Sequence, residues 1–236
     1  MRKSFFVASV ATLALGTAGV AYAQLPDPSI EATGSGSPSK AGTKSKPKAV
    51  TFKLDVKNNA EAKTTAKSIK ITFPKTIKVS TKGLNECDPE TDQALIDDPS
   101  QCSSSKAGKG SASANLNPFS ATPAPLNFQI QPYVGKNEIL FLLSGSANTI
   151  LHGKIKGQSM TIEITPDLQQ PVTGVFSALN EIAATIKAKK GKNSLISAVG
   201  CSGGKHTIGV EVAYVGNPNP PAKPSAKDSF DIKCSK

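Results

Sequence analysis

The sequence predicts an all-β protein, an antiparallel β-sandwich of Ig-like or jelly-roll-like type, with one short helical turn near residues 89–96. Two observations carry this prediction. Apolar and polar residues alternate in many short segments, which is the period of a strand with one buried face. Glycine, proline and asparagine separate these segments at short intervals, as in sheets whose neighbouring strands are joined by tight turns.

The alternation begins at residues 50–56 and recurs along the chain. Its apolar members are Val50, Phe52, Leu54, Val56, Ile69, Ile71, Phe73, Ile77, Val79, Phe128, Ile130, Ile162, Ile164, Ile208, Val210, Val212 and Tyr214. Residues 139–143 (ILFLL) are continuously apolar instead. A strand of that kind is typical of the centre of a fold, where both of its faces are covered.

The predicted helical turn lies in an acidic segment. Asp88 is placed to cap it, Pro89 suits the first helical position, and Glu90 favours the positive end of the helix dipole. Residues 218–224 (PNPPAKP) are rich in proline and predict an extended loop before the last strand.

The chain divides into three regions. Residues 1–23 combine a basic start, an apolar stretch and Ala21-Tyr22-Ala23, which predicts a cleavable signal peptide and a secreted protein with no transmembrane anchor. Residues 24–48 are rich in proline, glycine, serine and lysine, and predict a flexible tether. Residues 49–236 are then expected to form a single β-sandwich domain.

The basic residues restrict the possible partners. The sequence has 28 basic and 17 acidic residues. Signal cleavage removes Arg2 and Lys3, so 28 − 2 = 26 basic residues remain, all of them lysine. The lack of arginine and tryptophan argues against nucleic acid. We expect weak contacts with an anionic polymer of the cell envelope or with another extracellular protein, and loose association with the envelope.

Four cysteines in an exported chain predict two disulfides. Three pairings are possible, and we favour Cys87–Cys102 and Cys201–Cys234, because each joins sequence neighbours. The strand parity of Cys201 and Cys234 also points both side chains inward. Zinc ligands stand two to four residues apart in metal-binding knuckles, and these cysteines do not.

The segment between Cys87 and Cys102 raises one metal hypothesis. Asp88, Glu90 and Asp92 have the every-second-residue spacing of a calcium loop, although Gln93 and Pro99 replace the glycine and glutamate of an EF-hand. A capped, solvated acidic turn is the competing interpretation.

The sequence contains one Ser-x-x-Lys match, Ser103 to Lys106, which lacks its companion motifs and is interpreted as a chance match. His152 and His206 stand alone, and no Gly-x-Ser-x-Gly elbow or phosphate-binding loop occurs. We therefore expect no enzyme, no cofactor and no catalytic residue. The alternative is a carbohydrate-binding or carbohydrate-active domain, which would need an exposed aromatic platform beside paired acids. Strand parity assigns Tyr214 to the core, so Tyr133 is the candidate platform.

Several segments together resemble a group of uncharacterised secreted actinobacterial proteins. They are SIKITFPKTIKVSTKGLNEC, CSSSKAGKGSASANL, KNEILFLLSG and LISAVGCSGGKHTIGVEVAYV. The resemblance spans nearly all of residues 50–234. It implies a strand that ends in Phe-Pro, an excursion with two cysteines followed by a Gly-Ser-Ala strand, and a closing unit in which two cysteines flank a strand.

Overall fold

Eleven strands form one antiparallel sheet in the computed structural model, which describes residues 25–216 and 223–236. The predicted signal peptide, residues 1–23, and residues 218–222 of the predicted extended loop lie outside the described residues. The strand order is β1-β3-β11-β6-β7-β8-β9-β10-β4-β15-β16. The antiparallel all-β class that the alternation predicted is confirmed.

The strands of this sheet are β1 (Ile30–Ser37), β3 (Thr51–Asn58), β4 (Thr65–Thr72), β6 (Gly108–Leu116), β7 (Ala124–Gly135), β8 (Glu138–Gly145), β9 (Thr149–Lys156), β10 (Ser159–Glu163), β11 (Ser177–Ile186), β15 (Lys205–Val215) and β16 (Ser225–Lys233). The shorter elements are β2 (Lys48–Ala49), β5 (Ile77–Val79), β12 (Lys189–Lys190), β13 (Asn193–Ser194), β14 (Ile196–Ala198), α1 (Asp92–Asp97), α2 (Pro166–Gln169), η1 (Ala60–Ala62) and η2 (Pro99–Ser105).

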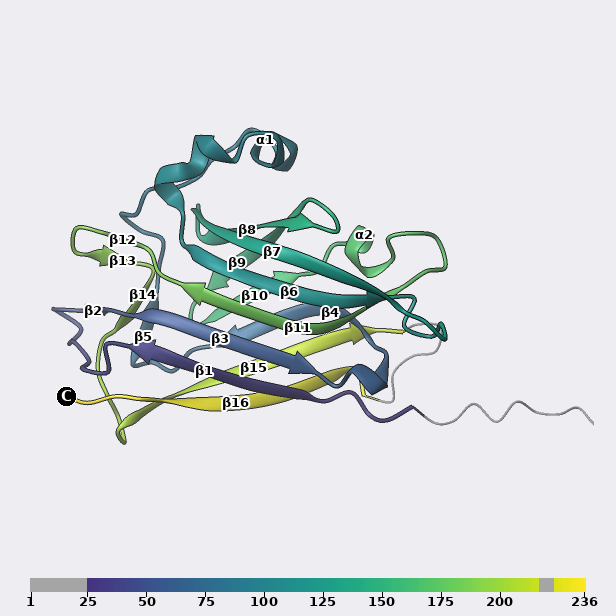
Figure 1. Cartoon of the computed structure of the whole chain (residues 1–236). Coiled ribbons are helices and arrows are strands. Elements are labelled where there is room, and N and C mark those ends of the chain that lie inside the picture. The colour runs from purple at the N-terminus through teal and green to yellow at the C-terminus, as the bar shows by residue number, and fades with distance from the viewer. Residues whose placement is uncertain (1–24, 217–222) are drawn as a thin grey trace, which may run out of the picture.

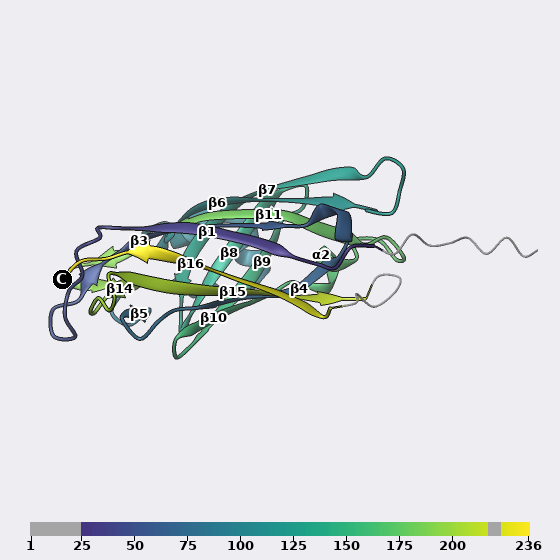
Figure 2. The same cartoon turned by 90° about the horizontal axis from the view of Figure 1, so that it is seen from below.

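The sheet folds back on itself, so that its two halves face each other as the layers of a sandwich do. Figure 2 shows β1, β3, β11, β6 and β7 on one side and β16, β15, β4 and β10 on the other, joined through β8 and β9. The two layers are thus parts of one nearly closed sheet. Alternate residues of every strand point between the halves, where they form the main core.

The two edge strands of the sheet, β1 and β16, lie side by side and run in the same direction (Figure 1). A Cβ atom added to Gly34 would meet the Phe230 ring, and one added to Gly36 would meet Ile232, so residues two apart on β1 contact residues two apart on β16. Beyond the strand ends, Lys40 and Ser235 form a parallel bridge. We call this contact between β1 and β16 the seam.

The prediction of a flexible tether over residues 24–48 is wrong for much of that segment. Residues 30–37 form β1, which pairs antiparallel with β3 from Ile30–Asn58 to Ser37–Thr51. Edge-strand pairing uses backbone groups, which glycine and serine supply as well as any other residue. The small side chains also leave room for Phe230 and Ile232, which lie across Gly34 and Gly36.

A second, smaller core lies on the outer face of β7, β8 and β9, beneath α1 and η2 (Figure 1). Leu95 of α1 packs there against Leu140, Leu142 and Tyr133. Residues 139–143 are therefore buried on both faces, as their continuous apolar character predicted. One face meets the main core and the other meets this outer core.

The predicted helical turn exists, but it begins later than expected. α1 runs over Asp92–Asp97, and its N-cap is Thr91, whose side chain accepts a hydrogen bond from the Ala94 N–H. Asp88 does not cap it. Thr91 stands directly before the helix, so its hydroxyl reaches the free N–H of Ala94. Asp88 lies three residues further from the start of the helix.

Both predicted disulfides are present, Cys87–Cys102 and Cys201–Cys234. The inward direction predicted for the second pair is not observed. Cys201 lies in the loop after β14 and Cys234 follows β16, and both side chains are half-buried. Cys87 and Cys102 are instead the buried pair, within the outer core.

Candidate functional site

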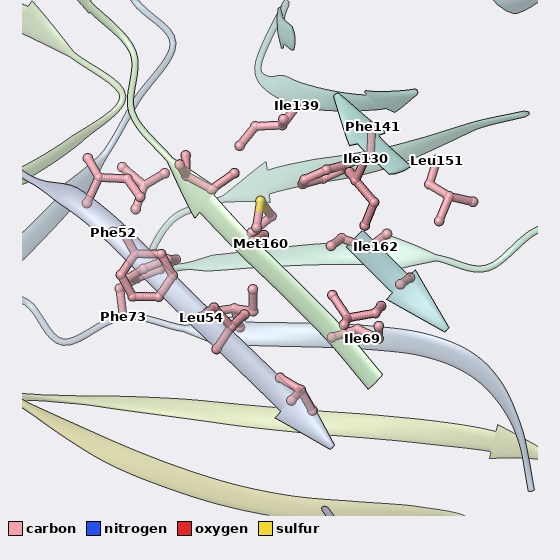
Figure 3. A pocket seen from close by; sticks show the side chains of 18 of the residues that line it. Phe52, Leu54, Ile69, Phe73, Ile130, Ile139, Phe141, Leu151, Met160 and Ile162 are labelled. Carbon is pink, nitrogen blue, oxygen red and sulfur yellow. The ribbon is translucent and has the colours of Figure 1, made fainter. Parts of the chain in front are cut away.

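The space between the two halves of the sheet contains an apolar cavity of about 60 Å³ (Figure 3). Figure 3 shows Phe52, Leu54 and Phe73 on one side and Ile130, Ile139, Phe141 and Met160 on the other, all directed toward this space. Every lining residue is apolar. Empty volume in a core costs roughly 24 cal/mol per Å³, so a void of this size lowers stability by about 1.4 kcal/mol.

Two further voids adjoin the first along the interior. One of about 50 Å³ shares the walls formed by Ala112, Leu143, Leu151 and Ile182 with the first cavity. A smaller one of about 10 Å³ shares Phe52, Phe73 and Ile196 with it on the other side. The three voids form a row inside the nearly closed sheet.

Lysine-rich segments that are distant in sequence meet at the end of the sheet where β2, β5, β12, β13 and the C-terminus lie (Figure 1). We call this the basic end, formed by residues 38–49, 74–82, 187–194, 200–205 and 233–236. Backbone contacts hold it together: Lys48 pairs with Ala198 and Lys78 with Ser197, on opposite sides of β14. The Cys201–Cys234 disulfide joins two of these segments.

All fourteen lysines of the basic end are exposed: Lys40, Lys44, Lys46, Lys48, Lys75, Lys78, Lys82, Lys187, Lys189, Lys190, Lys192, Lys205, Lys233 and Lys236. The same segments contain no aspartate or glutamate side chain. Among the described residues, Lys205 is the one lysine of this end that forms an ion pair, with Asp231 of β16 at 2.6 Å. Lysines are therefore concentrated at one end, where the Lys205–Asp231 pair balances only a small part of the positive charge.

A histidine joins the outer core to α1. The Nε2 atom of His152 lies 3.1 Å from Oδ2 of Asp92, and its Nδ1 atom lies 3.0 Å from Oε2 of Glu138. Partial burial opposes the charged imidazolium, but hydrogen bonds and charge attraction from Asp92 and Glu138 outweigh it, and the pKa of His152 lies above its ordinary value. The contacts of His152 with Asp92 and Glu138 connect α1 to β8 and β9.

The three carboxylates of the calcium hypothesis do not converge. Asp88 and Glu90 are exposed, and Asp92 turns to His152. In residues 25–216 and 223–236, no group of three or more histidine, cysteine, aspartate or glutamate side chains is arranged to hold a metal ion.

The remaining candidate residues are buried. Tyr133 is 1% exposed and Tyr214 is 6% exposed, so neither offers a platform for a sugar. The Tyr214 hydroxyl donates to Oδ1 of Asn58, and burial raises the pKa of Tyr214. His206 is buried, with its Nδ1 atom 2.8 Å from Oγ1 of Thr76, and burial lowers its pKa.

Sequence reasoning missed the cavity, the basic end and the His152 group. One usable signal was present: the turn segments after residues 37, 73 and 186 contain several lysines and no acid. Their convergence depends on the strand order, which no local pattern reveals.

No family model matches this chain, and no curated protein matches it at a significant level. Among the helices of the described residues, none combines the length and the apolar character needed to cross a membrane.

Proposed function

We propose that this is an exported, non-catalytic binding protein that contacts an anionic polymer of the cell envelope through its basic end. The observation that carries the proposal is the convergence of fourteen exposed lysines in segments that contain no carboxylate side chain. Such a concentration of one charge raises the local concentration of polyanions and speeds their association.

The geometry favours many weak contacts over one specific pocket. Most of these lysines stand on turns and short strands, and a lysine ammonium is a flexible point charge without the planar, bidentate geometry of arginine. The two disulfides and the resemblance to secreted actinobacterial proteins support an extracellular location as part of this proposal.

The test compares two variants with the same change of net charge. In the first, Lys187, Lys189, Lys190 and Lys192 of the basic end become glutamine. In the second, Lys53, Lys57, Lys67 and Lys70, which are exposed on β3 and β4, become glutamine. Long-chain polyphosphate and isolated envelope serve as probes, at low and at physiological salt.

Binding of the wild-type protein is expected to fall steeply as salt rises, because released counterions drive such association. The basic-end variant should bind more weakly than the β3 and β4 variant. Equal losses in both variants would mean that only net charge matters, and salt-independent binding would contradict the proposal.

The carbohydrate alternative finds less support. Both described tyrosines are buried. A groove of about 840 Å³ on the outer face of β1, β3, β11, β6 and β7 is lined by polar residues, lysines, a few aliphatic residues and a single acid, Asp55, without an aromatic side chain.

A further inference from the structure

We propose that the apolar interior binds one unbranched acyl chain, which enters through the seam between β1 and β16. This site is separate from the basic end, and either proposal can fail without the other. It rests on the chemistry of the cavity walls, the row of voids and the way in which the sheet closes.

The walls of the interior select a hydrocarbon. The first cavity is lined by apolar residues alone, and the void of about 50 Å³ adds two polar residues, Ser113 and Ser177. The smallest void adds Ser39, His206 and Lys233 at its end of the row. A ligand with polar groups along its length would lose its hydrogen bonds to water without replacement. An acyl chain has no such groups beyond its carboxyl end.

The row of voids selects an unbranched shape. Neighbouring voids share wall residues: Phe52, Phe73 and Ile196 at one junction, and Leu143 and Leu151 among those at the other. Rotamer changes of these side chains would connect the voids into a narrow channel. Met160, a flexible side chain that adapts to irregular spaces, also lines the first cavity. A channel of this form accepts a chain of methylenes more readily than a fused ring system.

An aromatic path leads from the seam to the cavity. Phe230 of β16 lies across Gly34 of β1 and stacks on Phe52, with ring centroids 6.3 Å apart. Phe52 meets Phe73 edge-on at 5.5 Å, and both line the first cavity. Movement of Phe230 would therefore open the seam directly onto the interior.

The seam can open at low cost in backbone hydrogen bonds. In the described part of the chain, β1 pairs with β3 and β16 with β15, and no ladder joins β1 to β16. The hydrogen bond from the Ala32 N–H to Asp228, 2.7 Å long, crosses the seam. Side-chain contacts of Phe230 and Ile232 close the part between the strands, and backbone hydrogen bonds of Ser235 with Ser39 and Ala41 close the end beyond them.

The experiment measures binding of cis-parinaric acid, a fluorescent unbranched fatty acid, to the full chain in high salt, where contacts with the basic end are screened. Ala184→Leu places a larger side chain in the first cavity. Ala183→Leu is the matched control, because Ala183 is its neighbour on β11 and lines the outer groove instead. Ala184→Leu should weaken binding about tenfold or more, a factor readily resolved by titration. Ala183→Leu should leave binding unchanged.

Circular dichroism and thermal unfolding establish that each variant is folded. If Ala184→Leu does not fold, Ala112→Val, which adds less volume to the wall shared by two voids, takes its place. Absence of probe binding to the wild type would overturn the proposal. Equal effects of Ala183→Leu and Ala184→Leu would overturn it as well, since the probe would then bind outside the interior.

Two further measurements complete the test. Mass spectrometry of lipid extracted from the purified full chain identifies the source of the acyl chain, as a free fatty acid or as a phospholipid. Asp228→Ala, which removes the hydrogen bond across the seam, should speed probe uptake several-fold. An unchanged rate would overturn the seam as the entrance.

Discussion

The backbone N–H of Ala32 donates a hydrogen bond to Oδ2 of Asp228, which lies 196 positions further along the chain. This bond joins the first and last strands of the sheet. The Ala32 N–H belongs to an edge strand, and without Asp228 this donor would have to find its partner in water. A carboxylate on the opposite edge thus provides part of the closure that a backbone ladder would give in a fully paired sheet.

Replacement of Asp228 by alanine should lower the free energy of unfolding by about 1–3 kcal/mol, the usual effect of removing a charged partner from a partly buried hydrogen bond. Urea unfolding measures the change. The control is Asp231→Ala on the same strand, whose exposed ion pair with Lys205 should matter less. Equal effects of the two substitutions would show that the contact across the seam adds no more than the exposed contacts of Asp231.

Removal of residues 25–48 should destabilise the protein, because it takes β1 from the sheet. The deletion exposes the ladder of β3, removes the buried Ala32 and uncovers part of the core near Phe230. Thermal unfolding and size-exclusion chromatography should reveal a lower melting temperature and association through the free edge. A chain that begins at Asp27 is the control, and should behave as the longer chain does. A fully stable, monomeric deletion variant would contradict the structural role of β1.

Loss of either disulfide should cost about 2–5 kcal/mol in the free energy of unfolding. Loop length alone favours a larger cost for Cys201→Ser, since that bridge spans 33 residues against 15. Burial acts in the opposite direction, because Cys87→Ser leaves a hydroxyl and a thiol inside the outer core. We therefore expect Cys87→Ser to cost at least as much, measured by denaturant unfolding of the oxidised proteins. A clearly smaller cost would mean that the outer core is loosely packed.

The attachment of α1 should depend on pH through His152. Its pKa is raised in the folded protein, so protonation favours the folded form. This contribution is complete below the ordinary histidine value of 6.5 and disappears as pH rises through the higher folded value. Hydrogen exchange of the α1 amides should accordingly be slower near pH 6 than near pH 8, after correction for intrinsic rates.

His152→Gln is the control for this dependence, and should remove most of the difference between the two pH values. Because the imidazole and Asp92 are both substantially exposed, solvent screens the pair and global stability should change little. A pH dependence that persists in His152→Gln would assign it to another group.

The strands and their inward faces were predictable from residues alone. The pleat makes side chains alternate, so Phe52, Leu54 and Val56 identify the buried face of β3 before any partner strand is known. Continuous apolar character likewise predicted that β8 is covered on both sides. The disulfide pairing was predictable because each bridge joins cysteines that are close in sequence.

The tertiary structure decided what depends on strand order. Residues 33–37 lack large apolar side chains, and their composition suits a coil or an edge strand equally well, since backbone hydrogen bonds do not depend on side-chain identity. The close approach of β16 explains the glycines at positions 34 and 36, because a side chain there would meet Phe230 or Ile232. The basic end, the contact of His152 with Asp92 and the apolar cavity arise in the same way. Each brings together residues that are far apart in sequence. Long-range packing decides which of these residues meet, and local periodicity carries no information about it.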